Sequence, residues 1–341
     1  MMTKEKSKLI DKPNSLTETM INLLSSPEAR SFRDKKHLVE TDQLTTEEIE
    51  NIFALAKVYK KQRDEKLFPL HLLSQEHVAL TFYENSTRTK SSFSIATANL
   101  GANPVNLDIS TSSVAKGESL EDTARTLISM GVRAIVQRHS ENDAASELAH
   151  CLGRAASVIN AGSGKESHPT QALLDCFTML ETEKSLKGKR IAIVGDTKYS
   201  RVARSNVKLL SRMGAEIIIC SPPELAATDL LELTWGLEND LKTAVRDCDF
   251  IMALRIQNER LEKDLKIDQK KYIESYQINH DILKLAGKNV KVLHPGPVNR
   301  DLELSSKVMD DKERSLIEKQ VANGIFIRMA VLSLLLHSVF C

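Results

Sequence analysis

Residues 82–90 read Phe-Tyr-Glu-Asn-Ser-Thr-Arg-Thr-Lys, between an apolar, β-prone run at 77–83 and a helical pattern at 91–100. Three hydroxyls and a guanidinium therefore lie where a predicted strand gives way to a predicted helix. The first N–H groups of a helix have no partner inside it, and the helix dipole adds partial positive charge there. Such a turn favours a bound phosphate, to which Arg88 adds a planar, permanently charged fork.

The same turn also has a purely structural interpretation. Ser86 would cap the helix, Thr87 and Thr89 would lie in its first turn, and Arg88 would be solvated. The segment alone does not decide between a phosphate site and an ordinary helix cap, so the decision depends on the rest of the chain.

Length and composition limit the possible classes of protein. The chain has 341 residues, which suggests about two domains, and 41% are hydrophobic, enough for ordinary cores. A formal net charge of +1 gives no electrostatic reason to expect nucleic acid or an anionic membrane as a partner. The N-terminus lacks the apolar core of a signal peptide, so we expect a cytoplasmic protein. The longest apolar run, at 329–337, is too short to cross a bilayer and predicts a buried terminal helix.

Metal-binding patterns are missing from the sequence. The five cysteines are far apart without C-x-x-C spacing, and no His-Glu-x-x-His pattern occurs. We therefore expect reduced thiols and no structural zinc site within the chain.

Strand-like and helix-like segments alternate along most of the chain. Thr45 and Glu48 form an expected capping box before a helix at 49–61, and a short helix is expected near 16–24. The predicted strands are 78–83, 104–107, 134–137, 157–160, 190–194, 216–220, 250–254 and 290–293. This alternation predicts an α/β fold with two doubly wound domains, each with a central parallel sheet flanked by helices.

A polar stretch at 181–188 is the expected domain boundary. The last helix is expected to be interrupted at Asn323-Gly324, where it could bend. The expected units are a partly ordered extension at 1–34, a first domain at 35–180, a second domain at 181–314, and a C-terminal helix at about 315–341 that packs back on the first domain.

Further polar segments follow predicted strands, where α/β proteins bind their ligands. The loop 110–119 is rich in hydroxyls and contains Lys116, and Arg138 stands at a strand end, where its fork can reach a carbonyl or a phosphate. A flexible surface loop and a surface ion pair are the respective structural alternatives. In the segment 158–175, His168 and Gln171 are three residues apart and share one face of a helix's first turn. Their imidazole and amide would converge on one small ligand.

The second half begins like a dinucleotide-binding fold, with a strand at 190–194 followed by Gly195. The second and third glycines of G-x-G-x-x-G are missing, so the backbone cannot approach a pyrophosphate closely. A nucleotide-binding dehydrogenase is therefore disfavoured. This half offers arginines instead: Arg255, Gln257 and Arg260 follow another predicted strand, and two arginines with a glutamine suit a substrate with carboxylates.

Seven segments together resemble the aspartate carbamoyltransferase family, catalytic chain, within the aspartate/ornithine carbamoyltransferase superfamily. They are FYENSTRTKSSF, SSVAKGESLEDT, VQRH, INAGSGKESHPTQALLD, RVARSN, LRIQNER and HPGPVNR. Their order and spacing match the family over roughly residues 38–336. The departures are mild: Lys90 stands where arginine is common, and Ser163 where the family often has aspartate.

The resemblance implies that carbamoyl phosphate and L-aspartate give N-carbamoyl-L-aspartate and phosphate, a step of pyrimidine biosynthesis. The amine would attack directly, with no covalent enzyme intermediate, no metal and no organic cofactor. The active site would lie in the cleft between the two domains.

The resemblance also assigns roles to particular residues. Those expected to bind carbamoyl phosphate are Ser86, Thr87, Arg88, Thr89, Arg138, His168 and Gln171. Those expected to bind aspartate are Lys116, Arg201, Arg255, Gln257, Gly296 and Pro297. Those expected to act in catalysis are Arg88, Thr89, Lys116, Arg138 and His168.

The resemblance has consequences for assembly and motion as well. It implies a homotrimer with shared active sites, in which Ser112 and Lys116 reach into the neighbouring subunit. Glu84, Arg201 and Arg260 would bridge the two domains when substrates close the cleft. Regulatory chains or a dihydroorotase-type partner could join the trimer.

Two alternatives stay open at this point. An ornithine carbamoyltransferase would have H-C-L-P near its end and an aspartate with an S-M-G element in its second domain. Here His294-Pro-Gly-Pro297 replaces the first, and the only Ser-Met-Gly, at 129–131, comes too early for the second. A non-catalytic scaffold would have lost a site residue, and none of the matched positions is lost.

Overall fold

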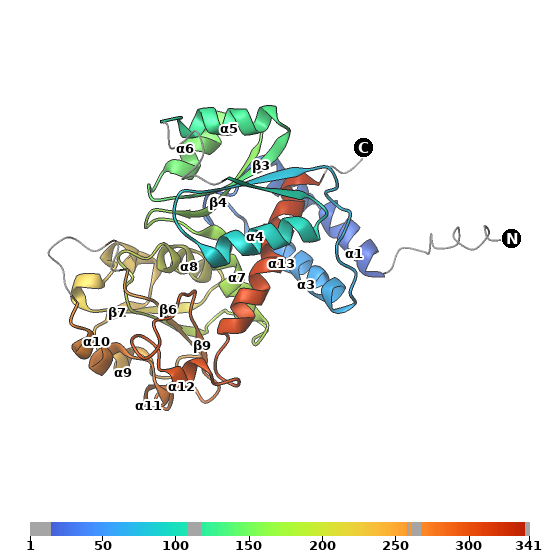
Figure 1. Cartoon of the computed structure of the whole chain (residues 1–341). Coiled ribbons are helices and arrows are strands. Elements are labelled where there is room, and N and C mark those ends of the chain that lie inside the picture. The colour runs from blue at the N-terminus through green and yellow to red at the C-terminus, as the bar shows by residue number, and fades with distance from the viewer. Residues whose placement is uncertain (1–14, 108–116, 258–259, 261–266, 338–341) are drawn as a thin grey trace.

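Two parallel sheets form the framework of the computed structural model, which describes residues 15–107, 117–257, 260 and 267–337. The first sheet has the order β2-β1-β3-β4 and the second β7-β6-β5-β8-β9, and Figure 1 shows helices around both. The first-sheet strands are β1 (His77–Phe82), β2 (Asn103–Leu107), β3 (Val132–His139) and β4 (Ser157–Ser163). The second-sheet strands are β5 (Arg190–Val194), β6 (Glu216–Cys220), β7 (Gly236–Glu238), β8 (Phe250–Ala253) and β9 (Lys291–Leu293).

The strand predictions are confirmed, and every pairing within the two sheets is parallel. Among the strands in the described residues, β7 alone was missed, because it has three residues, begins with a glycine and is half-buried throughout. Such a strand carries no two-residue alternation for a sequence pattern to detect.

The longer helices are α1 (Ser15–Leu24), α2 (Pro27–Lys35), α3 (Thr46–Asp64), α4 (Thr87–Asn99), α5 (Leu120–Ser129), α6 (Ala144–Leu152), α7 (Pro169–Leu180), α8 (Arg201–Arg212), α10 (Gln269–Tyr276) and α13 (Ile317–Leu336). The shorter ones are α9 (Leu241–Ala244), α11 (His280–Leu283) and α12 (Ser306–Met309), with 3₁₀ turns η2 (Pro223–Leu225) and η3 (Thr228–Leu233). The predicted capping box is present: the Thr45 side chain accepts from the Glu48 N–H, and the Glu48 carboxylate accepts from the Thr45 N–H.

The N-terminal extension is partly helical. The expected helix near 16–24 is α1, whereas α2 was not predicted because its buried face holds only Ala29 and Phe32. Both helices pack on α3.

The prediction that the last helix is interrupted at Asn323-Gly324 was wrong, because α13 is a single helix. The buried Asn323 amide donates to Thr178 Oγ1 at 3.0 Å and to a Glu181 oxygen at 2.8 Å, so neighbouring side chains satisfy it without a break. Gly324 leaves room for a side chain of the next turn, since a Cβ there would lie 2.5 Å from Arg328 Nη1.

By length and composition alone, α13 could cross a membrane. However, 78% of its apolar 18-residue stretch is buried inside the protein. The helix packs against α3, α4 and α7 (Figure 1). It is therefore a core helix of the fold.

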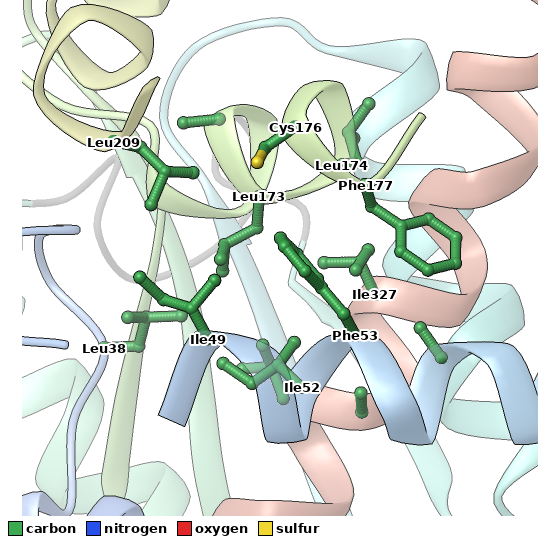
Figure 2. Packing of buried hydrophobic residues seen from close by; sticks show 14 of the residues in the cluster. Leu38, Ile49, Ile52, Phe53, Leu173, Leu174, Cys176, Phe177, Leu209 and Ile327 are labelled. Atoms are coloured by element: carbon green, nitrogen blue, oxygen red, sulfur yellow. The ribbon is translucent and has the colours of Figure 1, made fainter. Parts of the chain in front are cut away.

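The core fixes the position of α7, the helix that begins at the predicted ligand site. Figure 2 shows Phe53 of α3 and Phe177 of α7 side by side, with Ile327 of α13 next to them; the two ring centroids are 5.6 Å apart. On its other side α7 packs against α8, the first helix after β5. Burial on both sides leaves α7 little freedom to move, so its first turn is a rigid support for a ligand.

Candidate active site

A cavity of about 390 Å³ lies beyond the carboxyl ends of the strands, between the two sheets. Its walls come from the β1–α4 turn, the start of α7, the start of α8, the segment after β8, the 294–297 loop after β9, and α13. The lining residues are Asn85, Ser86, Thr87, Arg88, Thr89, Ser92, Arg138, His168, Gln171, Leu174, Ser200, Arg201, Val202, Leu254, Arg255, Gln257, Arg260, His294, Pro295, Gly296, Pro297, Gln320, Val321 and Arg328.

The β1–α4 turn presents its polar groups to this cavity rather than using them as caps. Ser86 is the N-cap residue of α4, yet its side chain makes no capping hydrogen bond. The structural interpretation of the turn, in which Ser86 caps the helix, is therefore not realised. The N–H groups of the first turn and the Ser86 hydroxyl remain available for an anion in the cavity.

The opposite wall is shaped to fit Arg88. Gly296 has a φ of +72°, and a Cβ there would lie 2.9 Å from Arg88 Cζ and 3.0 Å from Nε. The glycine thus serves two needs at once, a left-handed backbone and close approach of a guanidinium. Partial desolvation within the cavity and the nearby Arg255 lower the pKa of Arg88.

His168 is a neutral imidazole in this site. Burial, with Arg138 and Arg201 adding repulsion, holds its pKa well below the ordinary value. Its Nδ1 is buried without a hydrogen-bond partner among the described residues. A neutral imidazole can donate a hydrogen bond to a carbonyl oxygen without bringing in another positive charge.

Glu84 joins elements from both halves of the protein. One of its oxygens lies 2.7 Å from Arg201 Nη2 and 3.4 Å from Arg138 Nε, and the other lies 3.4 Å from Arg260 Nη2. Burial alone would raise the pKa of Glu84, but the three arginines together hold it below its ordinary value. Glu84 follows β1 and Arg138 lies near the end of β3, both in the first sheet, whereas Arg201 and Arg260 follow strands of the second sheet, so this cluster spans the cavity.

Gly162 makes room for two of these arginines. Its φ is +124°, and a Cβ there would lie 3.0 Å from Arg201 Cζ and 3.3 Å from Arg138 Nη1. Burial and Arg201 lower the pKa of Arg138 to about 9, so it stays cationic at neutral pH.

A buried aspartate shapes the segment after β8. Asp196 accepts from the Gln257 N–H at 2.9 Å and from the Tyr199 N–H at 3.0 Å. The Arg255 guanidinium donates to Gln257 Oε1 at 3.3 Å. Asp196 therefore fixes the backbone at Gln257, and the Gln257 side chain holds the Arg255 guanidinium beside it in the cavity wall.

The structure brings together most of the residues singled out in the sequence. Those that line the cavity are Ser86, Thr87, Arg88, Thr89, Arg138, His168, Gln171, Arg201, Arg255, Gln257, Arg260, Gly296 and Pro297. Glu84 lies behind the lining arginines, and Ser112 and Lys116 lie outside the described residues. The roles assigned to these residues stay predictions.

Arg328 and Gln320 were not singled out in the sequence, although both line the cavity from α13. Arg328 Nη1 donates to Ser92 Oγ at 2.7 Å, and its guanidinium lies 5.0 Å from the centre of the Phe93 ring. The sequence did contain a signal for Arg328, which is a single charged residue inside an apolar run. Burying a charge without a partner costs free energy, so such a residue is a candidate for a functional site. Within the described chain, no group of three or more His, Cys, Asp or Glu side chains could hold a metal ion.

One buried carboxyl behind the cavity wall gives a pH-dependent prediction. Burial raises the pKa of Asp175 to about 6, against hydrogen bonds that lower it. Between about pH 4 and 6 the folded state then binds a proton that the unfolded state has lost, so this group destabilises the fold as pH rises. We expect the unfolding free energy of the wild type, minus that of Asp175→Asn, to fall across this window in denaturant titrations. A difference that rises instead would contradict the assignment.

The two halves of the chain match two family models. Residues 36–181 match the aspartate/ornithine carbamoyltransferase carbamoyl-P binding domain, and residues 187–335 match the Asp/Orn binding domain of the same family. The chain belongs to the aspartate/ornithine carbamoyltransferase family. The resemblance found in the sequence is thereby confirmed.

Similar members of this carbamoyltransferase family cover nearly the whole chain. The chain is 43% identical over 304 residues to the aspartate carbamoyltransferase catalytic subunit of Sulfurimonas denitrificans, covering 89% of this chain and 100% of the relative. It is 44% identical over 300 residues to the corresponding subunit of Acetivibrio thermocellus, and the match covers 88% of this chain and 95% of the relative.

Solved structures of the family share the carbamoyltransferase fold. Aspartate transcarbamoylase from Trypanosoma cruzi in complex with N-(phosphonacetyl)-L-aspartic acid gives a TM-score of 0.82 at 31% identity, covering 90% of this chain and 97% of that one. Ornithine carbamoyltransferase from Pyrococcus furiosus gives a TM-score of 0.80 at 28% identity, and the match covers 89% of this chain and 98% of that one. The fold alone therefore does not separate aspartate from ornithine as the second substrate.

Proposed function

We propose that this protein is an aspartate carbamoyltransferase, which converts carbamoyl phosphate and L-aspartate to N-carbamoyl-L-aspartate and phosphate. The observation that carries the proposal is the charge of the cavity wall. Among the described lining residues there are six arginines and neither an aspartate nor a glutamate; the arginines are Arg88, Arg138, Arg201, Arg255, Arg260 and Arg328. Such a wall attracts a phosphate and a dicarboxylic amino acid, both anionic.

The same wall disfavours ornithine, whose second amino group would place a cation among the arginines. The Ser129-Met-Gly131 segment gives no support to ornithine either, because it joins α5 to β3 and is not among the lining residues. The position that an ornithine enzyme would fill with H-C-L-P is here the 294–297 loop, with Gly296 against Arg88.

In the proposed reaction the β1–α4 turn and Arg138 hold the phosphate. Thr89, Arg138 and His168 donate to the carbamoyl oxygen and stabilise the charge that grows on it as the aspartate amine attacks. Gln171 holds the carbamoyl amide, and Arg201, Arg255 and Gln257 hold the two carboxylates. The leaving phosphate accepts the proton of the attacking amine. No side chain acts as a nucleophile, so the rate comes from positioning and electrostatics.

A steady-state assay tests the proposal. The purified protein is given carbamoyl phosphate with either L-aspartate or L-ornithine, and carbamoylated product is measured. We expect kcat/KM for aspartate to exceed that for ornithine by at least about 1,000-fold, because a misplaced charge costs several kcal/mol. Comparable values, or a preference for ornithine, would overturn the proposal.

Glu84 provides a test of closure across the cavity. In Glu84→Gln the three arginines lose their shared carboxylate, so the two sides of the site are no longer tied together. We expect KM for aspartate to rise about tenfold or more, with little change in KM for carbamoyl phosphate, because aspartate binds mainly to the second half. Glu141→Gln, an exposed carboxylate on the surface, is the control. Equal losses for both substrates would argue against a closing role.

We also propose a cytoplasmic homotrimer in which Lys116 acts in the neighbouring subunit's site. Lys116→Ala chains and Arg88→Ala chains, each inactive alone, are mixed under conditions that exchange subunits. A shared site predicts that hybrid trimers regain activity, because some sites then receive both wild-type residues. If the hybrids stay as inactive as their parents, sharing is excluded. Regulatory chains or a dihydroorotase-type partner stay predictions.

A further inference from the structure

Asp175 connects three helices behind the wall of the cavity. It lies on α7, one turn after Gln171, and is fully buried. Its Oδ1 accepts from Gln171 Nε2 at 2.9 Å and from Gln320 Nε2 at 2.8 Å, and its Oδ2 accepts from Asn206 Nδ2 at 2.9 Å. Gln171 and Gln320 line the cavity, whereas Asp175 does not.

This arrangement determines which end of the Gln171 amide is available to a ligand. An ionised carboxylate can only accept hydrogen bonds, so it must face the NH₂ end of the amide. The Oε1 of Gln171 is then left for the cavity that this residue lines. An oxygen in that position requires an N–H or O–H donor from whatever occupies the site.

The same carboxylate also orients the facing wall. Because Gln320 Nε2 donates to Asp175, its Oε1 is free to accept, and it does so from the His294 N–H at 2.9 Å. His294 Nδ1 in turn accepts from the Gly296 N–H at 2.8 Å. A continuous chain of hydrogen bonds therefore runs from Gln171 through Asp175 to the 294–297 loop.

Ionisation of this carboxylate does not add to the stability of the fold. Its pKa is raised to about 6 by burial, so in the neutral range it is ionised at a cost to the fold. Well-packed apolar residues often replace buried charges without loss of stability. A buried, ionised group directly behind a cavity wall is therefore a candidate for a role in the site.

We propose that Asp175 is a positioning residue that makes the cavity select an acyl phosphate bearing an amide NH₂ over one bearing a methyl group. It turns the Gln171 oxygen toward the acyl group and, through Gln320, seats the 294–297 loop on the other side. The inference rests on the proposed function, because the group that this part of the site would recognise is the NH₂ of carbamoyl phosphate.

Two stable phosphonates that differ only at the position in question test the inference. Phosphonoacetamide carries the amide, and acetonylphosphonate carries a methyl group in its place. Isothermal titration calorimetry measures both Kd values, and their ratio is the selectivity. We expect the wild type to favour the amide at least about tenfold, because the methyl compound leaves a buried oxygen without a donor.

The variants separate positioning from a general structural effect. Gln320→Leu removes the link between Asp175 and the loop, so we expect its selectivity to fall at least about threefold. Asn323→Leu is the matched control: it also removes a buried amide that ties α13 to α7, but one turn away and not among the lining residues. We expect it to keep wild-type selectivity.

Two changes at Asp175 complete the set. Asp175→Leu should abolish the selectivity. Asp175→Asn should retain part of it, because its oxygen can still accept from Gln171 and Gln320. Its NH₂ would face the NH₂ of Asn206, so the Asn206 amide must flip to present its Oδ1, which is buried without a partner among the described residues.

Unchanged selectivity in Gln320→Leu, or an equal fall in Asn323→Leu, overturns the inference. If Asp175→Leu does not fold, the comparison of selectivity between Gln320→Leu and Asn323→Leu still tests the inference. A wild type that binds neither phosphonate contradicts the proposed function itself, which distinguishes the two failures.

Discussion

Replacing Gly296 by alanine is expected to lower kcat about 100-fold, the size of effect seen when one well-placed donor is lost from a catalytic site. The backbone at this position has a φ of +72°, and the new Cβ would lie 2.9 Å from Arg88 Cζ. Either the guanidinium moves or the 294–297 loop moves, and both of them line the cavity. A shift of this kind misplaces the group expected to hold the phosphate.

Gly188 supplies a control with the same backbone strain. Its φ is also +72°, but a Cβ there would have no neighbour within 4 Å. Both alanine variants should lose about 1 kcal/mol of stability from the left-handed conformation, as measured by denaturant titration. Only Gly296→Ala should lose activity. Equal kcat values in the two variants would show that close approach to Arg88 is unimportant.

Arg88→Gln is expected to lower kcat about 1,000-fold, because Arg88 combines phosphate binding with stabilisation of charge in the transition state. The stability of the folded state should not decrease. Arg88 is exposed to the cavity, and Arg255 already repels it, so removal of the charge relieves repulsion. We therefore expect an unchanged or slightly higher Tm by calorimetry.

Arg125→Gln serves as the control for a lost arginine, since Arg125 pairs with Glu121 on the surface of α5, away from the cavity. It should keep wild-type kcat. If the Arg88→Gln enzyme retains more than a tenth of wild-type kcat, Arg88 does not stabilise the transition state to the extent proposed.

The sequence predicted those parts of the site that depend on local structure. The β1–α4 turn and the start of α7 each place several polar groups within a few residues, so spacing along the chain is enough to bring them together. The carboxyl ends of parallel strands share one edge of a sheet, which explains why Arg138 and His168 meet at the same cavity.

What the sequence did not reveal depends on contacts between distant segments. Gln320 and Asp175 are 145 residues apart, and their hydrogen bond exists only because α13 packs on α7. No periodicity in either helix predicts such a pairing. The same packing explains why α13 continues through Asn323-Gly324, where we expected an interruption: distant side chains satisfy Asn323, and the missing Cβ accommodates Arg328.

The central claim is that one cavity holds a phosphate group and a dicarboxylic amino acid at the same time. N-(phosphonacetyl)-L-aspartic acid joins both in one molecule, and its binding to the intact protein can be measured by calorimetry, with solution mass measured in parallel. We expect one molecule bound per chain, at least about 1,000-fold more tightly than phosphate or succinate alone, because the second half of the ligand binds at a high effective concentration. Binding no tighter than that of phosphate alone would contradict the claim.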